Sequence, residues 1–234
     1  AYSARVVARD PYSDVALLSL DEQGFRPLAL GPTPPVGSLV LVVGTYLGRP
    51  WLSAYLGIVA GLHRHAEVGG RVIEDLVQVD AVVATGTSGG PVVDPEGRAV
   101  AMVIAMSVGG SFALPAESIE RAIRFYRRFG RVLRPFIGVH AAELTHGYAK
   151  LFGIPFWGRG VVVLKVLEGS PAAKAGIRPG DVIVEADGVE VKGLGVLRAA
   201  VERCAEEGRV LELVLWRRGR ELRVDVGVLL EELR

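Results

Sequence analysis

Gly86-Thr87-Ser88-Gly89-Gly90-Pro91 is the most informative stretch of this 234-residue chain. Glycines on both sides of Ser88 allow a tight turn that brings backbone amides close to a bound group. In such a loop the N–H groups of Gly86 and Ser88 can converge on an oxygen that becomes negative during acyl transfer. The Gly-Lys-Ser or Gly-Lys-Thr ending of a phosphate-binding loop is missing. The stretch therefore indicates a candidate serine nucleophile.

A second informative segment lies upstream and reads Asp10-Pro11-Tyr12-Ser13-Asp14-Val15-Ala16-Leu17-Leu18. Asp14 opens an apolar, strand-like run, and we expect its carboxylate to be buried there, where it could orient a histidine. No histidine precedes Asp14 in the sequence. Because a serine hydroxyl is a poor nucleophile at neutral pH without an adjacent base, this chain alone is expected to be nearly inert.

Composition restricts the class of protein. Half of the residues are hydrophobic and the formal net charge is only +1, so nothing calls for nucleic acid as a partner. The single cysteine, Cys204, excludes an internal disulfide, and its place in a helix-like segment favours a small packed residue over a reactive thiol. Asparagine is absent and glutamine occurs only twice, which fits a thermophilic source but equally a GC-rich genome. No apolar run reaches the roughly 18 residues of a membrane helix.

Short apolar segments separated by glycine-rich turns dominate the first half of the chain. The proline-rich segment 31–37 cannot continue a strand ladder, so it is interpreted as a crossing linker. Strands at such spacing favour a closed antiparallel barrel. The strands we expect lie at 4–8, 15–20, 39–43, 56–60, 76–79, 91–93, 99–105 and 111–114.

The pattern changes after Pro115, which opens a predicted helix that ends at Gly130. One face of this helix is apolar, with Ile119, Ala122, Ile123 and Tyr126. The opposite side is rich in arginine, and with a balanced overall charge we interpret it as a solvated surface rather than a site for a polyanion or a membrane. A domain boundary is expected near 131–134.

Beyond the boundary the sequence predicts a compact mixed unit. A strand is expected to begin at 136–139, and Thr145 is expected to cap a short helix that ends at Gly153. Pro171 stands at the first position of another helix, and Asp187-Gly188 is a two-residue hairpin signal. The remaining expected elements are strands at 161–167, 182–186, 189–191, 210–216 and 221–226 and a helix at 196–206.

In this order, the segments resemble the HtrA/DegP family, in which a trypsin-like serine protease domain precedes a PDZ domain. The resemblance implies a mainly β fold, a trypsin-like double β-barrel whose first barrel is incomplete, followed by an α+β PDZ domain. It implies a protease domain at 1–130, with the second barrel at about 38–115 and a connecting helix at 116–129, and a PDZ domain at 134–234. The segments that carry it are 9–18 (RDPYSDVALL), 74–81 (EDLVQVDA), 86–91 (GTSGGP), 112–115 (FALP) and 169–181 (GSPAAKAGIRPGD).

The resemblance also implies roles for the residues of the protease motifs. Ser88 matches the nucleophile, Asp14 the carboxylate of the catalytic triad, and the backbone of Gly86, Thr87 and Ser88 the oxyanion hole. The family usually has asparagine where Thr87 stands, but only the backbone of that position faces the chemistry. The catalytic histidine of the family precedes the position of Asp14. The chain is therefore either part of a longer precursor or a relative that has lost its base.

In the second half, Phe136-Ile137-Gly138-Val139 matches the PDZ loop that receives a C-terminal carboxylate. Gly138 has no side chain, so a peptide terminus can approach the loop amides closely, and the strand beyond can add the peptide as an extra strand. Leu197 and Val201 lie on the helix that would form the wall of this groove. Together with Phe136 and Ile137 they would line an apolar pocket for the last side chain.

The function that the resemblance implies is ATP-independent serine endopeptidase activity in protein quality control, with chaperone activity as a further possibility. Substrates would be unfolded or damaged proteins whose hydrophobic C-termini bind the PDZ domain. No metal or other cofactor is implied. The family also suggests a homotrimer, an extracytoplasmic location and a membrane anchor outside this sequence. The alternative is a non-catalytic scaffold, a pseudo-protease whose PDZ groove is the working part.

Other candidate residues favour structural interpretations. His63 and His65 are expected to be a surface pair rather than a substitute base, and no further ligand at metal-binding spacing accompanies them. Asp80 either shapes a specificity pocket or accepts hydrogen bonds from nearby backbone amides, and we favour the second. Glu74 and Asp75 are adjacent on a strand, so their side chains should face opposite ways.

Overall fold

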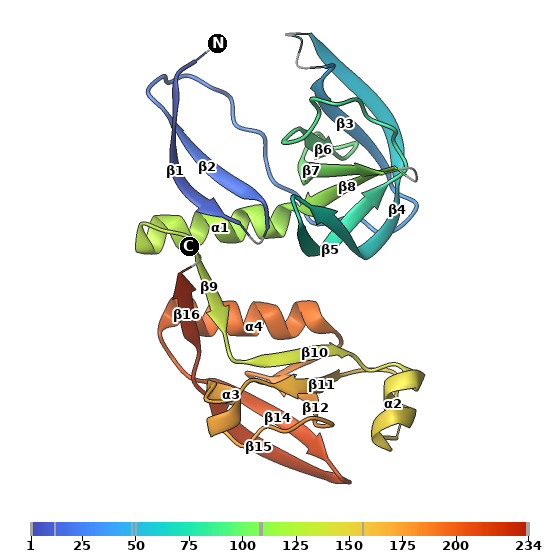
Figure 1. Cartoon of the computed structure of the whole chain (residues 1–234), viewed down its shortest axis with the longest axis vertical. Coiled ribbons are helices and arrows are strands. Elements are labelled where there is room, and N and C mark those ends of the chain that lie inside the picture. Colours follow the sequence, from blue (N-terminus) through green and yellow to red (C-terminus); the bar gives the residue numbers. More distant parts are fainter. Residues whose placement is uncertain are drawn as a thin grey trace. The chain divides into compact units, whose positions relative to one another are not determined.

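The computed structural model describes residues 2–11, 13–47, 49, 51–107, 110–155 and 157–232. It divides into two compact units, the first reaching Val132 and the second spanning Leu133–Glu232. Both consist mainly of strands with few helices, as the predicted mainly β fold requires (Figure 1). Tyr12 of the upstream motif lies outside the described residues.

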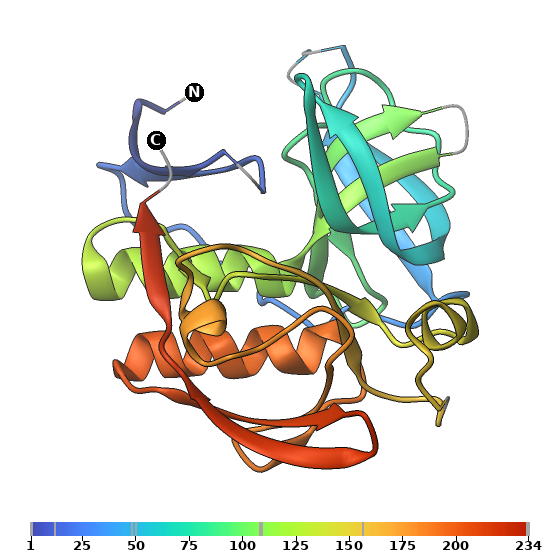
Figure 2. The same ribbon diagram turned by 60° about the horizontal axis from the view of Figure 1, so that its bottom comes forward.

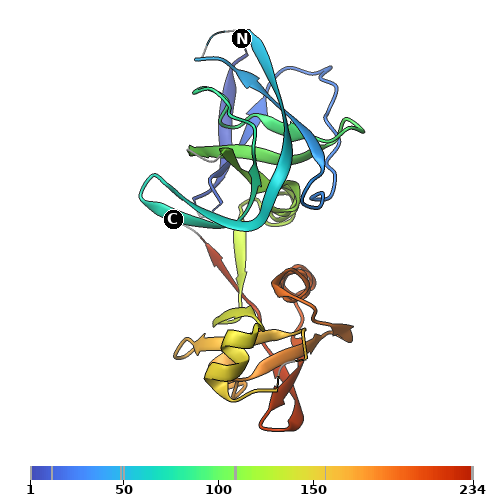
Figure 3. The ribbon, with the colours of Figure 1, turned by 90° about the vertical axis from the view of Figure 1, so that its right-hand side faces the viewer.

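The first unit contains the closed antiparallel barrel that the sequence predicted (Figure 3). Its strand order is β3-β4-β5-β8-β7-β6, and pairing of β3 with β6 closes it. Inward-facing valines fill the interior, as suits β-branched side chains on a pleated surface. The strands are β3 (Leu39–Thr45), β4 (Leu52–Val68), β5 (Arg71–Val79), β6 (Pro91–Val93), β7 (Ala99–Ser107) and β8 (Gly110–Pro115).

Strand β4 is much longer than the predicted segment 56–60. Its first half pairs with β3 and its second half with β5, and the β4–β5 register shifts at several bulges. Bulges bend a strand without ending it, so one strand can serve two sides of the barrel. The hairpin turn follows at Gly69-Gly70.

Strands β1 (Ala4–Asp10) and β2 (Val15–Leu20) form a separate two-stranded sheet outside this barrel. An isolated hairpin of two strands is at best marginally stable, so it needs packing elsewhere. Val15 provides that packing by joining a buried cluster with side chains from β5, β7 and β8. Arg71 Nη1 also donates to the Pro11 carbonyl oxygen at 3.1 Å, which fixes the hairpin turn against the start of β5.

Helix α1 (Ala116–Phe129) begins after Pro115 and ends at Gly130, whose φ of 71° is left-handed, as predicted. Its buried face differs in part from the expected one. Ala122 is buried, but the other three predicted residues are only half-buried, and Phe125 is fully buried. The stripe is therefore centred on Ala122 and Phe125, which lie three positions apart on one side of a helix.

The second unit is a five-strand path, β10-β11-β12-β14-β15, with a short strand β13 beside β12. Helix α4 lies along one face of this sheet and buries Leu197 and Val201 against it (Figure 2). Thr145 Oγ1 accepts a hydrogen bond from Tyr148 N, which confirms the predicted cap. Pro171 begins α3 as predicted, and Ser170 Oγ accepts a hydrogen bond from Ala173 N there. The elements are β10 (Val139–Glu143), α2 (His146–Phe152), β11 (Val161–Val166), α3 (Pro171–Lys174), β12 (Val182–Ala186), β13 (Val189–Glu190), α4 (Leu194–Glu207), β14 (Leu211–Arg217) and β15 (Arg220–Val226).

The predicted strand start at 136–139 is wrong in detail. Strand β9 (Leu133–Phe136) ends at Phe136, the chain turns at Ile137-Gly138, and β10 begins only at Val139. A strand that the sequence analysis missed, β16 (Leu229–Glu232), pairs with β9 to form a second small sheet (Figure 3). The break matters because it leaves the Ile137-Gly138 loop at the start of β10.

None of the helices in the described segments combines the length and apolar character needed to cross a membrane.

Candidate functional site

The loop that carries Ser88 is exposed and closely tied to the barrel. Gly86 and Gly89 have φ of 100° and 82°, a region that favours glycine. Gly89 N donates to the Val103 carbonyl of β7 at 2.8 Å. A Cβ at Gly90 would lie 2.2 Å from the Val43 carbonyl oxygen, so only glycine fits there. These contacts hold the Ser88 side chain toward solvent.

Thr87 explains how the loop tolerates a residue other than asparagine. Its side chain is fully buried. Its methyl group packs against Gly44 so closely that a Cβ on Gly44 would lie only 2.6 Å from it. Thr45 Oγ1 donates to the Gly86 carbonyl at 2.8 Å and so fixes the peptide plane between Gly86 and Thr87. The side chain of Thr87 therefore packs inward, away from the loop surface.

Of the three backbone amides at Gly86, Thr87 and Ser88, one donates a hydrogen bond within the loop and two do not. Thr87 N donates to the Ala84 carbonyl at 3.2 Å. Within the described part of the chain, neither Gly86 N nor Ser88 N has a hydrogen-bond partner. Two unpaired N–H groups flanking a serine are the donors that a developing oxyanion needs. Of the three predicted oxyanion residues, Thr87 contributes packing rather than a free donor.

The carboxylate of Asp14 is exposed, so the expectation that it is buried is wrong. Asp14 has a φ of 57° and directly precedes β2, whose first residue, Val15, is buried. The left-handed turn residue thus directs its own side chain outward and the next one inward. The buried acid of this turn is Asp10, which is 2% exposed and accepts a 2.5 Å hydrogen bond from Ser13 Oγ.

Strand β7 connects the two candidate catalytic residues. Gly89, next to Ser88, donates to the carbonyl of Val103, and Val15, next to Asp14, belongs to the same buried cluster as Ile104. The serine loop is therefore hydrogen-bonded to β7, and the residue after Asp14 packs in a buried cluster to which β7 also contributes.

The two histidines of the first unit are on the surface, as predicted. His63 Nδ1 lies 2.7 Å from Asp75 Oδ1, and the His63 side chain is 70% exposed. His63 and Asp75 both have left-handed φ values, and they lie where the register of the β4–β5 pairing shifts. Asp80 Oδ1 accepts a hydrogen bond from Ile58 N at 2.6 Å, which confirms its structural role. Across the described residues, no three His, Cys, Asp or Glu side chains are grouped in a way that could hold a metal ion.

The predicted peptide-binding residues gather where β10 meets α4. Gly138 has a φ of 89°, and a Cβ on it would lie 2.1 Å from Ser170 Cβ. The Ile137 carbonyl accepts a hydrogen bond from Ala172 N, and the Gly138 carbonyl accepts one from Leu167 N. Strand β10, which follows this loop, is at one edge of the sheet. Ile137 is buried in the same cluster as α4, whose Leu197 and Val201 join it. Val139 packs against this cluster, while Phe136 is half-buried at the end of β9.

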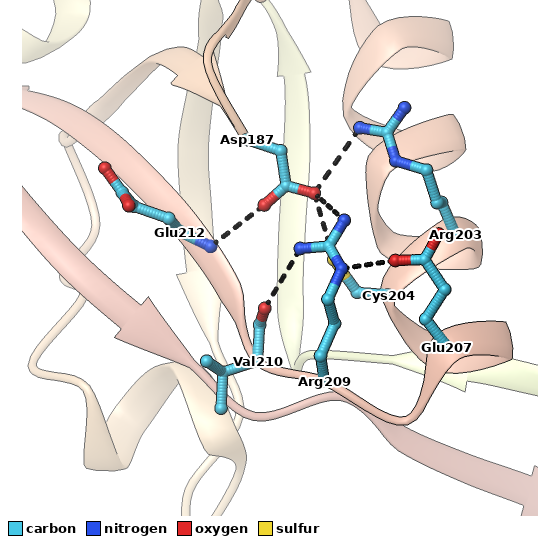
Figure 4. Close-up of polar contacts among 7 residues, drawn as sticks. All are labelled: Asp187, Arg203, Cys204, Glu207, Arg209, Val210 and Glu212. Carbon is cyan, nitrogen blue, oxygen red and sulfur yellow. Dashed lines mark hydrogen bonds and ion pairs between the residues drawn. The ribbon is translucent and has the colours of Figure 1, made fainter.

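A polar cluster around Asp187 was missed by the sequence analysis (Figure 4). Its carboxylate accepts hydrogen bonds from Arg209 Nη2 at 2.7 Å, Cys204 Sγ at 3.1 Å and Glu212 N at 3.2 Å, and Arg203 lies 3.4 Å away. The hydrogen bond from Arg209 holds the pKa of Asp187 well below its usual range, although burial opposes it. Arg203 and Arg209 lie 16 and 22 residues after Asp187, so no local pattern in the sequence indicates this cluster.

The same cluster accounts for the single cysteine. Cys204 is fully buried on α4. Burial, with help from the neighbouring Asp187 carboxylate, raises the pKa of its thiol to about 11. Since the thiolate is the reactive form, Cys204 is inert at neutral pH, which agrees with its interpretation as a packed helix residue.

Comparison with known proteins gives matches to both units. A family model described as trypsin-like peptidase domain matches residues 1–102, and one described as PDZ domain matches residues 135–228. The periplasmic pH-dependent serine endoprotease DegQ of Escherichia coli is 30% identical over 96% of this chain and 50% of its own length. A probable periplasmic serine endoprotease, DegP-like, of Bartonella henselae is 30% identical over 96% of this chain and 45% of its own. The chain thus spans about half the length of these relatives.

Solved structures agree with this. The HtrA-type protease AlgW with a tripeptide matches 99% of this chain and 78% of its own, with a TM-score of 0.74 and 28% identity. The same protease with a decapeptide matches all of this chain and 73% of its own, with a TM-score of 0.72 and 28% identity. The likeness therefore runs through both units and is not limited to one motif.

Proposed function

Since the chain belongs to the HtrA/DegP-type trypsin-like serine proteases with a C-terminal PDZ domain, we propose that its parent protein is an ATP-independent serine endopeptidase. Its substrates would be unfolded or damaged proteins, as befits protein quality control. We assign the protease domain to 1–130, with its second barrel at about 38–115 and a connecting helix at 116–129. The PDZ domain is assigned to 134–234.

The observation that supports catalysis best is the exposed Ser88, whose own backbone amide and that of Gly86 have no hydrogen-bond partner among the described residues. Ser88 Oγ would add to the carbonyl carbon of the scissile peptide bond, and its proton would pass to an imidazole supplied by the parent protein upstream of Asp14. The resulting oxyanion would accept hydrogen bonds from Gly86 N and Ser88 N. The imidazolium would then protonate the leaving amine, and water would hydrolyse the acyl-serine ester. Asp14 would orient the imidazole and stabilise its charge.

For the second unit, we propose that the groove between β10 and α4 binds the hydrophobic C-terminus of a substrate. The edge of β10 offers unpaired backbone groups to an added strand, and Leu197 and Val201 of α4 belong to the buried cluster against which Val139 of β10 packs. Gly138, whose φ of 89° favours glycine, lies in the loop whose amides would receive the terminal carboxylate. A groove of this kind concentrates unfolded chains next to the protease domain.

Further features of the parent protein are inferred by analogy with the relatives. They include a homotrimer, an extracytoplasmic location and a membrane anchor. The relatives named above are described as periplasmic. A thermophilic source rests only on the scarcity of asparagine and glutamine.

The test is labelling with a fluorophosphonate, which reacts covalently with an activated serine. The full-length parent and the 234-residue chain are treated side by side, each with a matched Ser88→Ala variant. We expect the parent to be labelled at Ser88 and the chain to stay unlabelled, because the chain lacks an upstream imidazole. A parent that is not labelled, although it folds and binds peptides, would contradict the protease proposal.

That outcome would favour the second candidate, a pseudo-protease scaffold or a chaperone that works through its PDZ groove. The observation that favours it is the open edge of β10 beside α4, where a peptide could bind without any catalytic step. A chaperone would still suppress aggregation of an unfolded protein after Ser88→Ala. A protease without chaperone activity would not.

A further inference from the structure

Strand β10 presents two chemically different faces at the open edge of the sheet. In its pairing with β11, the register shifts between His140 and Ala141, and the extra residue, Leu164, lies in β11. Strand β10 therefore keeps a regular alternation from Val139 to Glu143. Val139, Ala141 and Glu143 share one face, while His140 and Ala142 share the other.

Pairing identifies the face that looks toward α4. Residues directly opposite each other in an antiparallel pair have side chains on the same face. Glu143 is opposite Val161, which is buried in the cluster that contains Leu197 and Val201. Ala141, packed against that cluster, is opposite another of its members, Val163. The carboxylate of Glu143 therefore lies on the groove side of β10.

A glycine at the start of α4 leaves room for this carboxylate. A Cβ on Gly193 would lie 2.6 Å from Glu143 Oε1, so the acid occupies the space beside that residue. Glu143 is exposed, and across the described segments it has neither a hydrogen bond nor an ion pair, although Lys192 precedes Gly193. By contrast, Glu190 on β13 is paired with Arg159 at 2.6 Å. Glu143 thus carries a negative charge without an ion-pair partner among the described residues, at the end of β10 beside the start of α4.

A peptide added antiparallel to β10 meets these residues in a fixed register. If its last residue lies opposite Val139, with its side chain toward Leu197 and Val201, the second residue before the last lies opposite Ala141. The fourth residue before the last then lies opposite Glu143, on the same face. The intervening residues face the side of His140 and Ala142.

We propose that Glu143 is a specificity-determining residue that selects C-terminal peptides with lysine or arginine at the fourth position before the last residue. This inference rests on the proposed PDZ function and names the class of peptide that the groove prefers. Charge complementarity is the physical reason, because a basic side chain at that position meets an acid with no partner of its own. The small side chain of Ala141 leaves space for a larger residue at the second position before the last.

The test measures binding of fluorescent peptides to the 234-residue chain by fluorescence anisotropy. The peptides end in the same apolar residue with a free carboxylate, and carry lysine, alanine or glutamate at the fourth position before the last. At low salt we expect lysine to be preferred over glutamate by about 3- to 10-fold, the range of an exposed ion pair and its like-charge counterpart. The preference should shrink at high salt, where exposed charges are screened. A peptide with lysine at the third position before the last should bind like the alanine peptide.

Variants of the chain test the residue itself. Glu143→Gln should remove the preference, and Glu143→Arg should reverse it in favour of the glutamate peptide. The matched control is Glu221→Arg, an equal change of charge on β15, at the opposite edge of the sheet from β10. The control should keep the preference for lysine.

The two levels of the proposal fail in different ways. If peptides with a free carboxylate bind no better than their amidated forms, the groove function and this inference are both wrong. If they bind but the lysine and glutamate peptides are equal, only the role of Glu143 is wrong. The role of Glu143 is also wrong if lysine at the third position helps as much as at the fourth.

Discussion

Asp14 in the first unit and Asp187 in the second are turn residues of β-hairpins with nearly the same backbone, φ of 57° and 50°. Their side chains are used in opposite ways. Asp187 is nearly buried and accepts hydrogen bonds from three side chains and one backbone amide. Asp14 is exposed, and the described residues offer it no partner. The comparison teaches that local turn chemistry places an aspartate, while the tertiary surroundings decide whether it stabilises the fold or stays available for chemistry.

Other acids of the molecule follow the same division. Asp181 is almost fully buried, and Arg217 donates to both of its oxygens at 2.6 Å. In the first unit, Asp94 accepts from both the backbone and the side chain of Arg98 at 2.8 Å. Buried acids with arginine partners hold loops in place, because removing either partner would leave a charge uncompensated. Asp14 and Glu143 have no such partner and also lie in the two candidate sites, which makes them the acids proposed here for function.

The largest expected effect is that of Asp14→Asn in the full-length parent. If Asp14 orients the catalytic imidazole, kcat for peptide hydrolysis should fall by about 10⁴-fold, because the imidazole would lose its orienting acceptor. The stability should change by less than about 0.5 kcal/mol, since the side chain is exposed. Steady-state cleavage of an unfolded protein and thermal unfolding measure the two effects.

Asp10→Asn is the matched comparison, because Asp10 is the other acid of the same turn. It is buried and bonded to Ser13, so its loss should lower stability more than it lowers the turnover of the folded enzyme. The role of triad carboxylate would pass from Asp14 to Asp10 if the Asp10 variant folded normally but lost its activity while the Asp14 variant stayed active.

A second expected difference separates Gly138 from Gly89, two glycines with similar left-handed φ in the two candidate sites. A Cβ at Gly138 would meet Ser170 at 2.1 Å, whereas one at Gly89 would meet nothing within 4 Å. Gly138→Ala should therefore destabilise the second unit by about 3 kcal/mol, from both backbone strain and steric overlap. Gly89→Ala should cost about 1 kcal/mol in the first unit, from strain alone.

Calorimetry of the 234-residue chain can follow both variants, and the peptides described above report on the groove. Gly138→Ala should also weaken peptide binding, while Gly89→Ala should leave it unchanged. Equal losses of stability for the two variants would mean that steric overlap with Ser170 adds nothing to the destabilisation by Gly138→Ala.

Much of the fold could be predicted because its signals are local. The Gly130 and Gly153 helix ends, the Thr145 cap and the Asp187-Gly188 turn each depend on one or two residues and were placed correctly. The closed barrel followed from strand spacing alone. Ser88 could be proposed from the sequence because glycines around a serine are a local pattern as well.

The errors concern features that depend on distant parts of the chain. Strand β16 exists because β9, far earlier in the sequence, offers it a partner, as the Leu229–Phe136 pairing shows. The burial of Phe125 depends on what packs against α1, and periodicity alone could not choose it over Ile123. The exposure of Asp14 and the partners of Asp187 were missed for the same reason. In both cases the neighbours that decide the matter come from other elements.

A smaller effect than that of Gly138→Ala is expected for Asp187→Asn, which removes the charge from the second hairpin turn. At neutral pH this change should lower the stability of the second unit by about 1–2 kcal/mol, because Arg209 and Arg203 lose a charged acceptor and are themselves partly solvated.

Acid should reduce this difference, and the sign follows from the direction of the pKa shift. The hydrogen bond from Arg209 lowers the pKa of Asp187 in the folded state, so its stabilisation is complete above the unfolded pKa of about 4. As the pH falls below that value, the unfolded chain takes up a proton before the folded one does, and the advantage of the carboxylate over the amide of the variant shrinks. Urea unfolding from pH 7 down to about pH 3 measures the difference in unfolding free energy between the unchanged chain and Asp187→Asn. The control is Glu168→Gln, at an exposed acid of the same unit, which should show no such trend. A difference that stayed constant over this range would mean that Asp187 acts through shape and neutral hydrogen bonds, and the contrast with Asp14 would then rest on burial rather than on charge.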